Sequence, residues 1–72
     1  NGQFTIVNQG DNGDYLIELI DATGKVVYSE KSHLTDNESK VINPSNVSLG
    51  VYLVKLTNTN TNFNRTLRMI IK

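Results

Sequence analysis

The residues whose types suggest acid–base or nucleophilic chemistry lie around the single histidine of the chain. Ser32 precedes His33 directly, and Asp36 follows three positions later. Serine, histidine and aspartate form hydrolytic triads, but a triad needs a nucleophile and a base that converge from rigid elements beside an oxyanion hole. Three residues in one polar segment do not provide that arrangement. We therefore expect His33 to be a solvated loop residue and the protein not to be an enzyme.

A second polar segment has the composition of a cation-binding loop. Asp11, Asn12 and Asp14 carry oxygen atoms of the kind that bind Ca²⁺. The segment lacks the spacing of an EF-hand and its final glutamate, and the same residue types are common in ordinary turns. One histidine and no cysteine do not supply the nitrogen and sulfur ligands of a structural zinc site. The sequence therefore favours a turn here and predicts no metal or other cofactor.

The chain is short and electrically balanced. Its 72 residues allow one domain, 1–72, whose net stability we expect to be about 3–5 kcal/mol without disulfides. Seven basic residues balance seven acidic ones, so the net charge favours neither a nucleic acid nor an anionic membrane as partner. No segment has the roughly 20 apolar residues of a membrane span, and Asn1-Gly2-Gln3 does not open a signal peptide. We expect the chain to be a piece of a longer protein.

Apolar residues recur at period two in short segments that polar turn residues separate. The apolar segments are rich in valine, isoleucine, threonine and tyrosine, which favour strands over helices. Turn signals roughly every 8–12 residues indicate a small antiparallel β-sandwich. We expect residues 30–39 to be a polar connection and the strands to cover residues 4–7, 15–20, 25–29, 40–42, 51–57 and 65–71. The inner faces are expected to hold Phe4, Ile6, Ile17, Leu19, Val26, Val41, Tyr52, Val54, Leu56, Leu67 and Met69.

Two turns that contain glycine punctuate these strands. In the segment 21–25, Asp21 can accept hydrogen bonds from backbone N–H groups two or three residues on, and Gly24 supplies a positive φ. Residues 15–29 should then form a β-hairpin. Gly50 opens the longest strand, on which Tyr52 is expected to face the core.

Four motifs follow one another along the chain. They are the opening Gly2-Gln3-Phe4-Thr5-Ile6, the turn within Ile20–Val27, the strand Val47–Leu56 and the basic–apolar ending Leu67–Lys72. In this order and spacing, over essentially all 72 residues, the chain resembles the C-terminal sorting domains of the type IX (Por) secretion system of Bacteroidetes. The Asn-Pro that precedes this opening in the family falls before Asn1, at the boundary of the sequence. The chain departs from the motifs in carrying Val47 where leucine is usual and Arg68 where lysine is common.

The resemblance implies a small antiparallel Ig-like β-sandwich of about seven short strands at the end of a larger secreted protein. Such a domain is a non-catalytic signal that directs its cargo from the periplasm through an outer-membrane translocon, after which the cargo is secreted or held at the cell surface. The implied partners are the type IX translocon and a surface protease of the sortase kind. The expected signal or recognition residues are Asp21, Gly24, Lys25, Gly50, Tyr52, Lys55, Arg68 and Lys72.

These residues allow two roles, in folding or in direct contact with the translocon. Gly24 and Gly50 meet a need for positive φ, and Tyr52 suits packing. Arg68 and Lys72 are the better candidates for contact because they are charged and lie near the end of the chain.

Two other functions are compatible with the same fold. One is an accessory carbohydrate- or surface-binding module of a secreted enzyme, which would need exposed aromatic faces. Aromatic residues are scarce, and Phe63 is the one candidate for exposure, with a cap over one end of the core as the alternative. The other is a plain structural spacer of the fibronectin type.

Overall fold

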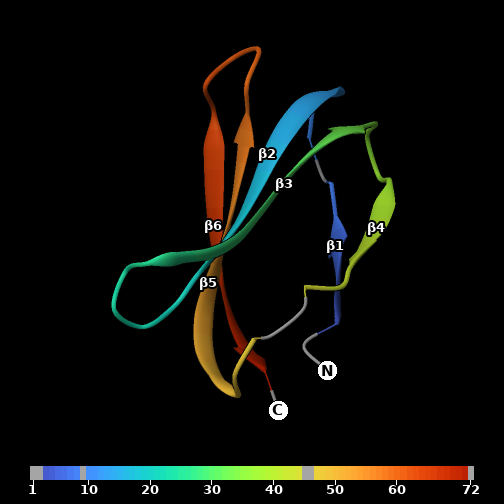
Figure 1. Ribbon diagram of the computed structural model, residues 1–72. Coiled ribbons are helices and arrows are strands. Elements are labelled where there is room, and N and C mark those ends of the chain that lie inside the picture. Colours follow the sequence, from blue (N-terminus) through green and yellow to red (C-terminus); the bar gives the residue numbers. More distant parts are fainter. Residues whose placement is uncertain (1–2, 9, 45–46, 72) are drawn as a thin grey trace.

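The fold is an all-β sandwich built from two antiparallel sheets. A computed structural model describes residues 3–8, 10–44 and 47–71 of the chain. The described residues form the six strands that the sequence pattern predicted, where the resemblance implied about seven: β1 (Phe4–Val7), β2 (Gly13–Ile20), β3 (Val26–Leu34), β4 (Ser39–Ile42), β5 (Gly50–Asn58) and β6 (Asn64–Ile71). Strands β1 and β4 form a small sheet, and the other four form a larger one in the order β3-β2-β5-β6. Figure 1 shows the small sheet beside the larger one as a second layer.

The core lies between the two sheets, on the inner face of β2 and β5. Both strands alternate between buried and more exposed residues, as period-two sequences predict. Phe4 and Met69 are half-buried and pack against the core. The buried apolar side chains are Ile6, Tyr15, Ile17, Leu19, Leu34, Ile42, Tyr52, Val54, Leu56 and Ile71. The core prediction is thus confirmed for Ile6, Ile17, Leu19, Tyr52, Val54 and Leu56.

Strand β3 is longer than its sequence predicted. The expected polar connection over residues 30–39 begins as strand, because residues 28–34 pair with residues 13–19 of β2. Leu34, at the end of this ladder, is fully buried opposite Gly13. Polar side chains do not prevent a segment from joining a sheet when its backbone completes a neighbour's hydrogen bonds.

Two valines that were placed in the core are exposed. Val26 is 44% exposed because the β2–β3 register shifts after Leu19, and this bulge turns Val26 to the outer face opposite Ile20. Val41 is 54% exposed because Ile42, the next residue, takes the inward position opposite Phe4. A displacement of one residue moves a side chain from one face of a strand to the other, so both predictions were wrong.

Strand β6 carries a third departure from the predicted core. Leu67 pairs with Val54 and therefore faces the same side of the sheet, as predicted, yet it is 49% exposed. The small sheet has only two strands opposite four, and it leaves the first half of β6 uncovered, since Leu67 is exposed whereas Ile71 at the end of the strand is buried.

Candidate functional site

His33 does not belong to a catalytic arrangement. It lies on β3 and not in a loop, as the sequence had suggested, and its Nδ1 is 3.0 Å from Asp14 Oδ1 on the neighbouring strand. The expected solvation is confirmed, since the side chains of both residues are about two-thirds exposed. Asp36, which follows His33 by three residues, does not take part in this pair. It donates its backbone N–H to Asn12 Oδ1 at 2.7 Å. Ser32 and His33 are successive residues of β3, so their side chains point to opposite faces and do not converge as a triad requires.

The Asp- and Asn-rich segment after β1 is a turn whose polar atoms bind one another. The carbonyl of Asp11 accepts hydrogen bonds from the Tyr15 hydroxyl at 2.7 Å and from the Asn8 side chain at 3.2 Å. Within residues 3–8, 10–44 and 47–71 no three histidine or carboxylate side chains lie close enough to hold a metal ion. In the same described ranges no helix has the length and hydrophobicity to cross a bilayer.

The β2–β3 hairpin turn is organised around Asp21. Its Oδ1 accepts hydrogen bonds from the Thr23 hydroxyl at 2.6 Å, the Thr23 N–H at 2.9 Å and the Lys25 N–H at 3.0 Å. The N–H groups are two and four residues on, rather than the two or three that were expected. Gly24 has φ of +90°, as predicted, and its N–H donates to the Asp21 carbonyl. These hydrogen bonds all lie inside the turn and stabilise it.

Acid is expected to destabilise the domain, because folding lowers the pKa of three carboxyl groups: Asp21 in this turn, Glu30 and Glu38. The Thr23 hydroxyl and then the Lys25 amide lower the pKa of Asp21 below its ordinary 3.8. The Tyr28 hydroxyl and then Lys40 lower the pKa of Glu30, and the Thr35 amide and hydroxyl lower that of Glu38, both ordinarily 4.5. A group whose pKa is depressed by folding stabilises the native state above its unfolded pKa and ceases to do so as the pH falls through its folded value.

The melting temperature should therefore fall as the pH drops below about 4. Asp21→Asn should be less stable than the wild type at neutral pH, and the difference should shrink toward about pH 2, where the wild-type carboxyl is also protonated. Thermal melts across this range measure it. A difference that stays constant with pH would show that the charge of Asp21 does not act in the turn.

Gly50 and Tyr52 both contribute to the turn that leads into β5. Gly50 has φ of +150°, a backbone conformation that other residues rarely adopt, so the prediction of a positive φ is confirmed. Tyr52 is buried on the inner face of β5, and its hydroxyl donates to the Ser48 carbonyl at 2.6 Å. This contact closes the turn that leads into β5, since Ser48 lies just before Gly50.

The outer face of the larger sheet carries a group of apolar side chains that the core does not use. Val26, Ile20 and Leu53 occupy one row across three strands, and Val51 pairs with Ile70 in the next row. Val26, Val51, Leu53 and Ile70 are each 41–56% exposed, and Ile20 is half-buried. Side chains opposite one another on one face of a sheet are in contact range, so these five form one surface, here called the outer patch.

Basic residues from the sequence prediction flank the outer patch. Arg68 is exposed on β6 and pairs with Leu53, in the same row as Val26 and Ile20. Lys55 lies one row further, where it pairs with Glu18. Lys25, at the hairpin turn, directly precedes Val26 and is exposed. The fold thus gathers Lys25, Lys55 and Arg68 around one surface, whereas Lys72 lies outside the described residues.

The sequence carries one signal of the outer patch. Strand β5 has apolar residues on both faces, since Val51 and Leu53 alternate with Tyr52 and Val54. An antiparallel strand with one face in solvent normally shows polar residues there. The exposed apolar face of β5 therefore indicated a surface with a further use.

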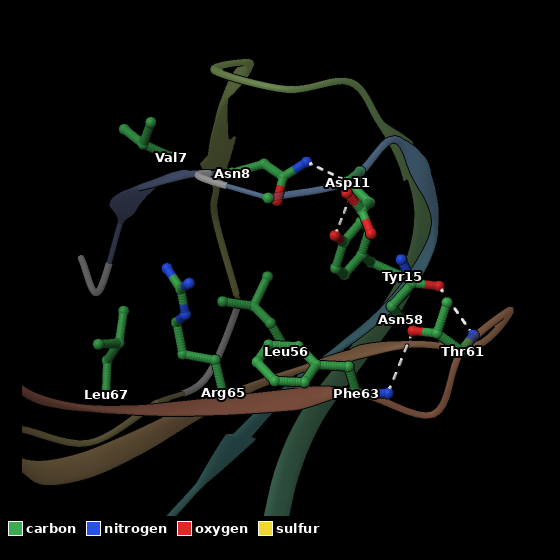
Figure 2. Close-up of a pocket in the computed structure, with 11 residues that line it drawn as sticks. Val7, Asn8, Asp11, Tyr15, Leu56, Asn58, Thr61, Phe63, Arg65 and Leu67 are labelled. Atoms are coloured by element: carbon green, nitrogen blue, oxygen red, sulfur yellow. Dashed lines mark hydrogen bonds between the residues drawn. The ribbon is translucent and has the colours of Figure 1, made fainter.

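A cleft opens at the other side of the molecule, between β1 and β6. Its volume is about 300 Å³, and Figure 2 shows the Arg65 and Leu67 side chains of β6 pointing toward the segment that carries Val7 and Asn8. Phe63 lies at its rim and is 65% exposed, so it does not cap the core. Tyr15 and Tyr52 are buried and Phe4 and Tyr28 are half-buried, which leaves a single well-exposed aromatic ring in the described chain. One ring is a poor platform for stacking sugars.

Comparison with known proteins gave one finding. A family model described as the secretion system C-terminal sorting domain matches residues 1–72. No curated protein and no solved structure matches the chain.

Proposed function

The chain belongs to the secretion system C-terminal sorting domain family, and we propose that its outer patch is the surface through which the type IX outer-membrane translocon recognises it. The domain is a non-catalytic sorting signal that directs a cargo protein through the type IX secretion system. A sorting signal acts by interacting with secretion machinery, so it needs a surface that remains accessible once the domain has folded.

The observation that carries the proposal is the exposure of the outer patch. The largest contiguous apolar patch on a soluble monomer is often a binding surface. The patch spans all four strands of the larger sheet, β3, β2, β5 and β6. The hydrogen-bonded ladder between these strands holds its side chains in place. A partner that covers the patch gains apolar burial, and Arg68 at its edge offers a charged contact that aligns the two surfaces.

The residues named from the sequence then divide between two roles. Asp21, Gly24, Gly50 and Tyr52 support the turns that bring β2, β3 and β5 together. Lys25, Lys55 and Arg68 are the contact residues in this proposal, and Lys72, which lies outside the described residues, stays a prediction. The motifs of the family combine both roles, because the turns must form before the patch exists.

The proposal also covers the route of the cargo. Residues 1–72 form a single domain at the C-terminal end of a larger secreted protein. The protein passes through the periplasm, the translocon exports it, and a surface protease of the sortase kind removes the domain so that the cargo is released or held at the cell surface.

Fusion of residues 1–72 to a periplasmic reporter tests this function in a bacterium with an active type IX system. We expect export of the reporter, and its retention in the periplasm when the translocon is deleted. Retention in the competent strain, where an established sorting domain exports the same reporter, would contradict the proposal. Equal export with the domain placed inside the reporter would support a plain spacer instead.

A further inference from the structure

The sandwich is incomplete over β6. The small sheet has two strands, and the ion pair between Lys40 Nζ of β4 and Glu30 Oε2 of β3, 3.1 Å long, fixes it toward the β3 side of the larger sheet. On the opposite side the cleft separates β1 from β6, and Leu67 is left half-exposed on a face that elsewhere is core. The space beside β1 is where a third strand of the small sheet would lie.

The backbone of β1 presents an unpaired edge to this space. Among the described residues β1 pairs with β4 alone. Asn8 directs both its N–H and its carbonyl toward the β4 side, with bonds to Glu38 and Asn37 of 2.9 and 2.6 Å. Backbone groups of successive residues in a strand point to opposite sides, so those of Val7 and Thr5 point to the open edge. Such an edge accepts another strand.

The cleft also has a defined charge. The Arg65 side chain lines it, and no carboxylate of the described residues lies within 4.0 Å of its guanidinium. Asp11 lines another part of the cleft, and Figure 2 shows it away from Arg65. A ligand with a carboxylate near Arg65 is attracted, whereas a second carboxylate near Asp11 is repelled.

We propose that the cleft binds an extended segment of a partner polypeptide, which adds to the free edge of β1 as a third strand. Its inward side chains are apolar against Leu67 and Phe63, and one is an acidic residue that pairs with Arg65. A polypeptide fits because its backbone can form a ladder of hydrogen bonds with the N–H and carbonyl groups of the edge. Every second side chain of the added strand then contacts the cleft and provides specificity. This site lies on the other side of the sheet from the outer patch and does not depend on the sorting proposal.

Titration of the 72-residue chain with a synthetic peptide, Thr-Val-Thr-Glu-Thr-Val-Thr with both ends blocked, tests the proposal. Nuclear magnetic resonance should show saturable shifts largest at the backbone amides of Thr5 and Val7. Replacing the glutamate of the peptide by lysine should weaken binding about three- to tenfold, and Arg65→Glu in the chain should reverse this preference. Equal affinity for the two peptides, or shifts centred elsewhere, would overturn it.

A matched pair of proline variants isolates the backbone contact. Val7→Pro removes an N–H that points to the open edge of β1, whereas Val41→Pro removes one that points to the opposite edge of the same sheet, at a similarly exposed position. Only Val7→Pro should abolish binding. If Val7→Pro does not fold, Arg65→Glu decides the matter alone. Protection of Thr5 and Val7 that rises with protein concentration without peptide would mean that a second copy fills the cleft and would overturn the proposal.

Discussion

Ile17→Ala is expected to leave the domain largely unfolded at room temperature. Ile17 is fully buried at the middle of β2, between Glu30 of β3 and Leu56 of β5. Truncating such a side chain costs about 2–5 kcal/mol, because the removed atoms lose their burial and leave a cavity. The total stability expected of a domain this small is about 3–5 kcal/mol. Circular dichroism during denaturation by urea measures the loss.

The control for this variant is Leu53→Ala on the neighbouring strand. Leu53 is 41% exposed on the outer face, so its truncation leaves no internal cavity and should cost less than about 1 kcal/mol. A cooperative transition of Ile17→Ala close to that of the wild type would show that the core has been assigned to the wrong face of the sheet.

The second large effect concerns export. Val51→Thr combined with Leu53→Thr should reduce export of a fused reporter at least tenfold while the domain remains folded. Threonine keeps the preference for strands but removes apolar surface from the centre of the outer patch. If each side chain contributes about 1 kcal/mol to the contact, the pair accounts for more than a tenfold change in affinity. Reporter activity in the medium, set against the melting temperature of each variant, separates recognition from folding.

The same change elsewhere on the surface provides the control. Val41→Thr with Leu49→Thr alters a valine and a leucine, 54% and 70% exposed, that belong neither to the outer patch nor to the cleft. This pair should leave export unchanged. Equal loss of export from both pairs would indicate a general effect of surface hydrophobicity and not recognition of the outer patch.

Much of this fold was predictable because local rules decide it. The period-two alternation of apolar residues predicted β2, β5 and β6. The turns that contain Gly24 and Gly50 predicted a positive φ at both residues. The length of β3 was not predictable in this way, since its second half is polar and is held by the ladder with β2. The exposure of Val26 depends on a bulge, and that of Leu67 on how many strands lie opposite. Neither is encoded in a local segment of sequence.

The candidate site was also predictable only in part. The motifs identified Asp21, Gly50 and Tyr52, but spacing alone does not tell a residue that shapes a turn from one that contacts a partner. Burial and hydrogen bonds make that distinction here, as in the Tyr52 hydroxyl bond to Ser48. The outer patch required the register of four strands, because its members come from distant parts of the chain and meet only across the ladder.

Photo-cross-linking from the outer patch in a bacterium with an active type IX system tests the central claim most directly. A photoreactive residue in place of Leu53 should cross-link the exported fusion to a component of the translocon. The same residue in place of Lys31, which is exposed on the outer face of β3 away from the patch, should not. Cross-linking from position 31 but not from position 53, in fusions that are both exported, would contradict recognition through the outer patch.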